Sequence, residues 1–194
     1  MRAAEDWFGL AVSGEIFVED ARYYLRRTLQ RYDYIILDVF SGESAPGHVL
    51  SLEAFQLAHQ RINPGGVLAI NVVGCLGEGH VVVPSVARSL EEMFDHVLIH
   101  PIEHPDFSNG CSNVILFAYD GVERVPDLTV VRDKRIHSMA AKAAKAMTRS
   151  YRLPSDVEAF VITDDFNPTD LLDLPVREKL RRNTLADLNW ELLL

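Results

Sequence analysis

The sequence predicts an α/β protein with a doubly wound, mostly parallel sheet, an antiparallel hairpin at one edge and a helical C-terminal tail. Three observations support this prediction. Short apolar runs alternate with segments of helical periodicity, the pattern of strands connected by helices. The runs are apolar at nearly every position, as in strands that helices cover on both faces. The last two runs, near Val97 and Val114, follow one another with no helical segment between them.

Five apolar runs bounded by turn residues are the expected strands. The strongest reads YIILDV, in which five of six residues are apolar and the other is Asp38. The third run follows the turn Asn63–Gly66, whose proline and glycines favour a reversal of the chain. In chain order the runs are Glu15–Val18, Tyr34–Val39, Val67–Val73, Val97–Ile102 and Val114–Tyr119.

Four segments have the periodicity of helices that bury one face. They are Ala21–Gln30, Ser51–Ile62, Val82–Phe94 and the alanine-rich Asp133–Ser150. Ser51 is a suitable N-cap for the second of them. The apolar runs end near Pro126. We therefore expect residues 1–126 to form the sheet domain and residues 127–194 to form a helical extension that packs on it, with one short extended piece at Val161–Ile162.

The chain is acidic, with 28 Asp and Glu against 19 Lys and Arg and a formal net charge of −9. It therefore lacks the basic surface expected of a nucleic-acid-binding protein. A negative field would attract a cationic substrate such as a polyamine. The alternative is that the charge serves solubility alone, as it does in many acidic proteins.

The cysteines and the apolar segments indicate in which cellular compartment the protein is expected. Cys75 and Cys111 form no C-x-x-C pair, so neither a zinc ribbon nor a thioredoxin-type motif is expected. A reducing compartment, and hence the cytoplasm, is the expected location. Residues Met1–Leu10 include Arg2, Glu5 and Asp6 and lack the apolar core of a signal peptide. The most apolar stretch, 67–83, is too short and too polar to span a bilayer.

Polar residues at the ends of the expected strands are the first candidates for a site, because ligands of open α/β sheets bind outside the carboxyl ends of the strands. Asp38 precedes a small, polar loop and either contributes to a site or caps a turn. Asp20 is either the N-cap of a helix or an acceptor for an adenine amino group. Candidates at these strand ends are Glu19, Asp20, Asp38 and Asn71–Gly74.

A third acidic cluster comprises Asp164, Asp165 and Asp170. Three carboxylates within seven residues can attract a cation, but the same residues also suit an Asx turn and the start of a helix. His96, His100 and His104 recur every fourth residue, yet prolines interrupt the run. On a strand the outer two would lie roughly 26 Å apart at about 3.3 Å per residue, so no shared metal is expected.

No familiar catalytic motif is present. The sequence contains no G-x-S-x-G elbow, P-loop or H-E-x-x-H. Gly74, Gly77 and Gly79 follow a strand but lack the spacing of a dinucleotide-binding fingerprint.

Five segments resemble, in order and spacing, the spermidine synthase-like proteins, and among them the bacterial branch often fused to membrane transporter segments. The resemblance extends from about Arg2 to Leu172. The segments are VEDARYYLRR (18–27), RYDYIILDVFSGESAPGHVLS (31–51), INPGGVLAINVVG (62–74), NVILFAYD (113–120) and ITDDFNPTDLL (162–172).

The resemblance implies a Rossmann-like, class I methyltransferase-like fold with strand order 3-2-1-4-5-7-6. It also implies transfer of an aminopropyl group from decarboxylated S-adenosylmethionine to a diamine such as putrescine, with the nucleoside as co-substrate and with neither a permanently bound cofactor nor a metal. Asp20 and Ala21 would then contact the adenine, and Asp38 would lie near the donor and the attacking amine. Asp164 and Asp165 are further candidates for substrate binding.

The sequence departs from the family pattern at two places. Ser41 stands where polyamine-making members have a second aspartate in a D-S-x-D pattern, and Glu43 is the nearest substitute. The segment RAAEDWFGL resembles the helix after the family's first two strands, so residues 1–126 are expected to form a partial domain without those strands or their glycine-rich turn. Such a domain would leave open edges at Glu15–Val18 and Tyr34–Val39. Either these strands pair directly, or another chain supplies the missing unit, or the chain is a truncated gene product.

Three functions are compatible with these observations. The first is an aminopropyltransferase-type enzyme, as an incomplete copy. The second is an S-adenosylmethionine-dependent methyltransferase, which Ser41 favours because a methyl acceptor need not be a diamine. The third is a non-catalytic remnant or an interaction module. The family also implies a homodimer, although the β-domain that usually forms the dimer is not recognisable here.

Overall fold

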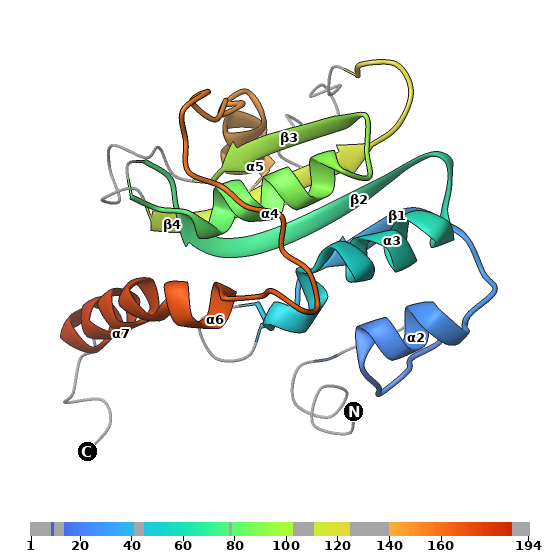
Figure 1. The fold of residues 1–194 in the computed structure, drawn as a ribbon, viewed down its shortest axis with the longest axis horizontal. Coiled ribbons are helices and arrows are strands. Elements are labelled where there is room, and N and C mark those ends of the chain that lie inside the picture. The colour runs from blue at the N-terminus through green and yellow to red at the C-terminus, as the bar shows by residue number, and fades with distance from the viewer. Residues whose placement is uncertain are drawn as a thin grey trace.

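The computed structural model describes Gly9 and residues 14–40, 45–77, 79–102, 111–124 and 140–187. These residues form a four-stranded sheet with helices packed against it (Figure 1). The strands are β1 (Tyr32–Leu37), β2 (Ile62–Cys75), β3 (His96–Pro101) and β4 (Cys111–Tyr119). The helices are α2 (Ala21–Arg27), α3 (Leu52–Arg61), α4 (Val82–Glu91), α5 (Ala140–Met147), α6 (Thr169–Leu172) and α7 (Leu174–Asp187), with a 3₁₀ turn η1 (Gly47–Val49).

The sheet has the order β1-β2-β4-β3. β1 pairs with β2 in parallel, and β4 is antiparallel to both β2 and β3. Three of the four described strands therefore point the same way, and β4 forms the expected antiparallel hairpin with β3. This order agrees with the 4-5-7-6 end of the class I methyltransferase-like sheet. The Rossmann-like fold class is thus confirmed.

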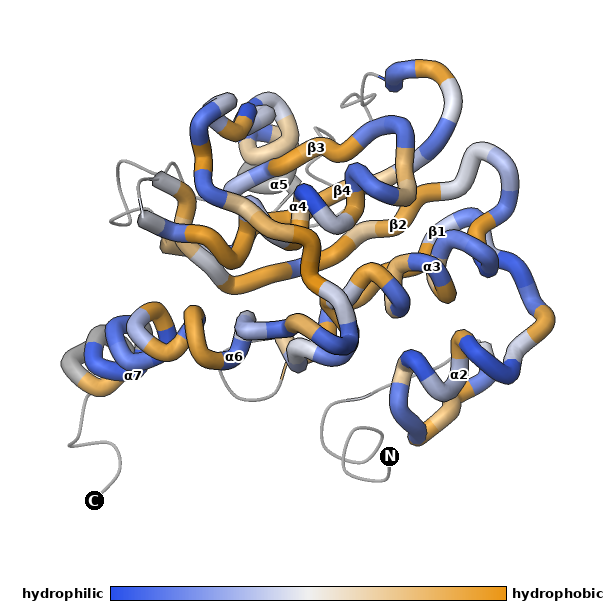
Figure 2. The backbone as a smooth tube through the Cα atoms, in the orientation of Figure 1, coloured by the Kyte–Doolittle hydropathy of each residue, from blue (hydrophilic) through white to orange (hydrophobic). Residues whose placement is uncertain are grey.

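One face of the sheet carries the core. Leu68, Ile70 and Val72 of β2 are at most 2% exposed, and they face α3 and α4. Phe55 of α3 and Leu90 of α4 are fully buried in the same cluster. Figure 2 shows that β2 is mostly hydrophobic, whereas α7 is mostly hydrophilic. Within the described part of the chain, no helix is long and apolar enough to cross a membrane.

Local signals fix the starts of two helices. The Ser51 side chain accepts a hydrogen bond from the backbone N–H of Ala54 at 3.3 Å and caps α3, as expected. Asp20 caps α2 by accepting from the backbone N–H of Tyr23 at 3.0 Å. At the start of β2, a Cβ on Gly66 would lie only 2.7 Å from the backbone oxygen of Asp33. Gly66 is therefore needed for the close approach of β2 to β1.

The expected first strand, Glu15–Val18, is wrong. These residues form no strand, and Val18 is 86% exposed. Phe17 instead packs on Tyr24 of α2, with ring centroids 4.8 Å apart. A strand needs a partner to satisfy its backbone groups, and none of the described strands pairs with Glu15–Val18. The direct pairing of this segment with β1 is therefore also wrong, because among the described strands β1 pairs only with β2.

Burial of β1 on both faces is also wrong among the described residues. Ile35 and Leu37 are 7% exposed, but Tyr34 and Ile36 are 73% and 72% exposed. Although the residues of this strand are nearly all apolar, buried and exposed side chains alternate along it. One face packs into the core and the other is an open apolar surface.

The C-terminal segment crosses back over the sheet domain. α5 lies within the expected helix Asp133–Ser150, of which residues 133–139 fall outside the described part. Val161–Ile162 forms no strand. Instead, Ile162 is fully buried, its backbone N–H donates to Ser89 Oγ at 2.8 Å, and its oxygen accepts from the backbone N–H of Leu52 at 2.8 Å. The division into residues 1–126 and 127–194 stays a prediction.

His100 in β3 is a buried titratable group. It is 3% exposed, and its ring lies edge-on to Phe117 with centroids 5.6 Å apart. Within the described structure neither of its ring nitrogens has a hydrogen-bond partner. Burial lowers the pKa of His100 below its usual 6.5, and the nearby backbone of Ala146 and Arg149 opposes this shift only in part.

This lowered pKa predicts a loss of stability on the acid side. Because the unfolded state binds the proton more tightly, the free energy of unfolding falls as the pH drops below 6.5. We expect His100→Leu to flatten this loss, as measured by urea unfolding over a series of pH values. His96→Leu, on the same strand, is the matched control and should retain the loss. Identical profiles for His100→Leu and the wild type would exclude His100 as the cause.

Candidate functional site

A polar cluster joins the starts of α2 and α3 to the segment Thr163–Asn167, which we call the strap. We name this cluster the Asp164 network after its central carboxylate. Its residues come from four places in the chain that the fold brings together, and they are Asp20, Arg22, His48, Ser51, Glu53 and Asp164.

Asp164 makes the most contacts in this network. Arg22 donates to its two carboxylate oxygens from both terminal nitrogens, at 2.8 and 2.7 Å. Ser51 Oγ donates to it at 2.6 Å, and its own backbone N–H donates to Glu53 at 2.9 Å. The Arg22 guanidinium and the Ser51 hydroxyl together lower the pKa of the Asp164 carboxyl to about 2. Asp164 is therefore anionic at physiological pH and is held firmly in place.

Removal of the Asp164 charge should destabilise the fold. We expect Asp164→Asn to cost about 1–2 kcal/mol, since it removes charge-assisted hydrogen bonds but the Asp164 side chain is partly exposed to solvent. Because the folded-state pKa is depressed, the wild-type advantage is present above pH 3.8 and is lost as the pH falls towards 2. Thermal unfolding at pH 7 and at low pH measures both effects. The exposed neighbour supplies the control variant Asp165→Asn; an equal loss there would contradict this account.

Asp20 belongs to the same network. In addition to capping α2, Asp20 forms a hydrogen bond with His48. The distance between Asp20 Oδ2 and His48 Nε2 is 2.7 Å. The backbone N–H of Tyr23 is the main cause of a lowered Asp20 pKa, and His48 adds to it. His48 is in turn tied to α2, because its backbone oxygen accepts from Arg22 Nη1 at 2.9 Å.

The strap is also fastened to η1. Asn167 Nδ2 donates to the backbone oxygen of Gly47 at 2.7 Å. A Cβ on Gly47 would lie 2.9 Å from Thr169 Oγ1 of α6 and 3.3 Å from Asn167 Oδ1 of the strap, so glycine allows η1 to approach both closely. The 3₁₀ turn η1, the start of α2, the start of α3 and the strap are therefore joined by hydrogen bonds.

Asp38 follows the last residue of β1 and shares no hydrogen bond with the Asp164 network among the described residues. It is exposed, and it accepts from Asn71 Nδ2 of the neighbouring strand β2 at 2.9 Å. Asn71 Oδ1 is buried and has no partner among the described residues. The carboxylate and the amide therefore lie side by side where a Rossmann-like sheet binds its ligands. Asp165 is exposed on the strap, and Ser41 and Glu43 lie outside the described residues.

A groove of about 420 Å³ runs between α2 and the outer edge of β1. Apolar and aromatic side chains line most of it, and the hydroxyls of Tyr24 and Tyr32 are 2.5 Å apart at its wall. Of the described site residues expected from the sequence, Ala21 is the only one in its lining. The lining residues are Glu15, Phe17, Ala21, Tyr24, Leu25, Gln30, Tyr32, Tyr34, Ile35, Ile36 and Leu37.

Comparison with known proteins gives a consistent result. The chain is 32% identical over 95 residues to polyamine aminopropyltransferase 2 of Pseudomonas aeruginosa, a match that covers 48% of this chain. It is 40% identical over 55 residues to the polyamine aminopropyltransferase of Vibrio vulnificus. In structure it matches a probable spermidine synthase from Corynebacterium glutamicum with a TM-score of 0.54 and 22% identity, over 81% of this chain and 61% of the other. The chain therefore resembles the polyamine aminopropyltransferases in sequence and a probable spermidine synthase in fold.

Two further matches involve methyltransferases. The chain is 33% identical over 120 residues to the N-terminal histidine N-methyltransferase of Emericella nidulans, a match that covers 59% of this chain. It also matches human methyltransferase-like protein 13, solved in complex with SAH, with a TM-score of 0.52 and 19% identity over 80% of this chain and 69% of the other. No family model matches the chain. The curated matches span 27%, 21% and 18% of the three relatives named.

Four members of the Asp164 network were not among the expected site residues: Arg22, His48, Ser51 and Glu53. Arg22 and Asp164 are 142 positions apart, so no spacing in the sequence links them. The one available signal is that both lie in segments that carry the family resemblance.

Proposed function

We propose that the protein transfers an aminopropyl group from decarboxylated S-adenosylmethionine to a diamine such as putrescine. The observation that carries this proposal is the exposed Asp38 carboxylate at the carboxyl end of β1, hydrogen-bonded to Asn71. The relatives named polyamine aminopropyltransferase support the transferase class. The net charge of −9 would favour approach of a polycation.

The reaction requires little of the protein beyond orientation and a proton acceptor. The lone pair of a neutral amine attacks the aminopropyl carbon bonded to the sulfonium, the C–S bond breaks, and methylthioadenosine leaves as a neutral thioether. The new secondary ammonium then loses a proton. We assign Asp38 to orient the amine and to accept that proton.

We assign the nucleoside to the end of the groove near Ala21, close to the capped start of α2. The groove volume of about 420 Å³ can hold a nucleoside, and the tyrosines in its lining suit an adenine ring. Asp20 would accept from the adenine amino group in this arrangement. The adenine amino group would then either share the Asp20 carboxylate with His48 or replace the hydrogen bond from His48. The Asp164 network has a supporting role, because it holds Asp20, η1 and the strap together.

Two measurements test the proposal in sequence. Calorimetric titration with methylthioadenosine should show binding in the micromolar range by the folded, monodisperse chain. Incubation with decarboxylated S-adenosylmethionine and putrescine should then yield spermidine and methylthioadenosine in equal amounts by mass spectrometry. Binding without transfer would leave a nucleoside-binding protein and refute the proposed reaction. If neither binding nor transfer is seen, the chain alone is not the enzyme.

Methyl transfer from S-adenosylmethionine is the second candidate function. It is favoured by the matches to two methyltransferases. In that case the chain would bind S-adenosylhomocysteine more tightly than methylthioadenosine. The same titration with both nucleosides distinguishes the two candidates, and gel filtration coupled to light scattering tests the homodimer that the family resemblance implies.

A further inference from the structure

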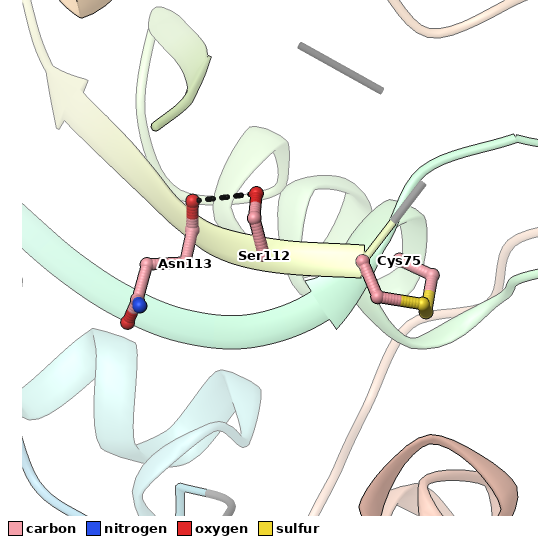
Figure 3. The surroundings of a disulfide bond; sticks show 4 residues. Cys75, Ser112 and Asn113 are labelled. Atoms are coloured by element: carbon pink, nitrogen blue, oxygen red, sulfur yellow. Dashed lines mark hydrogen bonds between the residues drawn. A yellow bond between two sulfur atoms is a disulfide. The ribbon is translucent and has the colours of Figure 1, made fainter. Parts of the chain in front are cut away.

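The two cysteines meet at one end of the sheet. Cys75 ends β2 and Cys111 begins β4, and the antiparallel register places them directly opposite one another. They form a disulfide, and Figure 3 shows Cys75 with this disulfide at the end of β2. Both are buried, at 3% and 7% exposed. The two residues are 36 positions apart, so the strand register alone brings them together.

His80 completes a cluster with the two cysteines. Cys75, His80 and Cys111 each offer one potential ligand atom, and these three atoms lie within 4.8 Å of one another. The imidazole is half-buried, so the cluster is accessible from the His80 side. Among the described residues, no other group of three or more His, Cys, Asp or Glu side chains meets this criterion.

The local backbone brings His80 to this position. A Cβ on Gly74 would lie 2.5 Å from Val83 Cγ2, so the end of β2 packs directly on the first turn of α4. Between them the chain reverses through Gly77 and Gly79, both of which have positive φ. His80 lies two residues before α4. Because the chain reverses after β2, His80 lies close to the end of that strand.

We propose that Cys75, Cys111 and His80 form a Zn²⁺ site once a thiol reductant has supplied two electrons and two protons to the disulfide. Two thiolates and one imidazole are ligands that zinc prefers, and a water molecule would complete a tetrahedron. Two Zn–S bonds of about 2.3 Å at a tetrahedral angle place the sulfurs about 3.8 Å apart. Reduction of the S–S bond lets the sulfurs separate, and the three ligand atoms already lie within 4.8 Å of one another.

The bound ion would tie together β2, β4 and the turn before α4. It would also act on α7, because Val176 packs in the same buried cluster as the two cysteines. The disulfide joins the two strands but leaves out His80. Dependence on His80 therefore separates a metal site from a structural disulfide.

Zinc binding by the purified full chain tests this proposal. The chain is reduced with a phosphine in the absence of oxygen, and Zn²⁺ is titrated in competition with a chromophoric chelator. We expect one equivalent bound by the reduced chain and none by the oxidised chain. Co²⁺ in place of Zn²⁺ should give thiolate-to-cobalt charge-transfer absorption and the intense visible bands of a tetrahedral site.

Matched histidine variants provide the decisive comparison. His80→Gln should weaken zinc binding by at least about 100-fold, since loss of even an outer-shell partner commonly costs about 10–100-fold. His96→Gln should bind as the wild type does, because His96 lies at the other end of the hairpin and contacts the Gly121 oxygen. Circular dichroism of both reduced variants verifies that they are folded. Equal binding by His80→Gln and wild type, equal losses in both variants, or no binding by the reduced chain would each overturn the proposal.

Discussion

Ile162→Ala is expected to lower the free energy of unfolding by about 2–5 kcal/mol. Ile162 is fully buried, and it lies in the core cluster with side chains of β2, α3 and α4. Truncation removes three buried carbons and leaves a cavity that packed neighbours fill only in part. Urea unfolding, followed by circular dichroism, measures the loss directly.

The effect should extend beyond the cavity itself. The backbone of Ile162 is hydrogen-bonded on both sides, to Ser89 Oγ and to the N–H of Leu52, at 2.8 Å in each case. Two residues later, Asp164 begins its contacts with Arg22 and Ser51. Ile162 therefore anchors the strap that carries Asp164. We expect hydrogen exchange at the start of α3 to accelerate in the variant.

The control uses the same substitution on an open surface. Ile36→Ala removes the same atoms from a side chain that is 72% exposed. The loss in the free energy of unfolding should therefore differ by no more than about 0.5 kcal/mol from the loss due to the lower strand propensity of alanine. A similar loss in the two variants would show that Ile162 is not an anchor.

The features that the sequence predicted correctly depend on short-range signals. Ser51 and Asp20 precede helices and have the side chains that cap them, so the starts of α3 and α2 could be placed from a few residues. The hairpin of β3 and β4 followed from two adjacent apolar runs with no helix between. The strand order followed from the family resemblance and not from periodicity.

The features that the sequence did not predict depend on contacts between distant residues. Glu15–Val18 has the composition of a strand, but a strand also needs a partner, and Phe17 packs on α2 instead. The Arg22–Asp164 pair joins segments 142 residues apart. Cys75 and Cys111 meet only because β2 and β4 adopt one register, and a slip of a single residue would turn one sulfur to the opposite face.

If the proposed reaction holds, Asp38→Asn should lower the kcat/KM of aminopropyl transfer by about 10²–10⁴-fold, the range expected for loss of a positioned proton acceptor. An asparagine oxygen can still accept the hydrogen bond from Asn71 Nδ2, so the fold should be unchanged. The substitution removes the negative charge and the proton acceptor and leaves the shape of the side chain nearly the same.

Asp33→Asn is the matched control, because Asp33 lies near the amino end of the same strand and accepts from Asn63 Nδ2 at 3.0 Å. It should transfer as the wild type does. Binding of methylthioadenosine, which is neutral, should be unchanged in both variants. A purely structural role for Asp38 would reduce nucleoside binding and transfer together. Loss of transfer with intact nucleoside binding would instead assign Asp38 to the amine, and unaltered transfer would remove it from the mechanism.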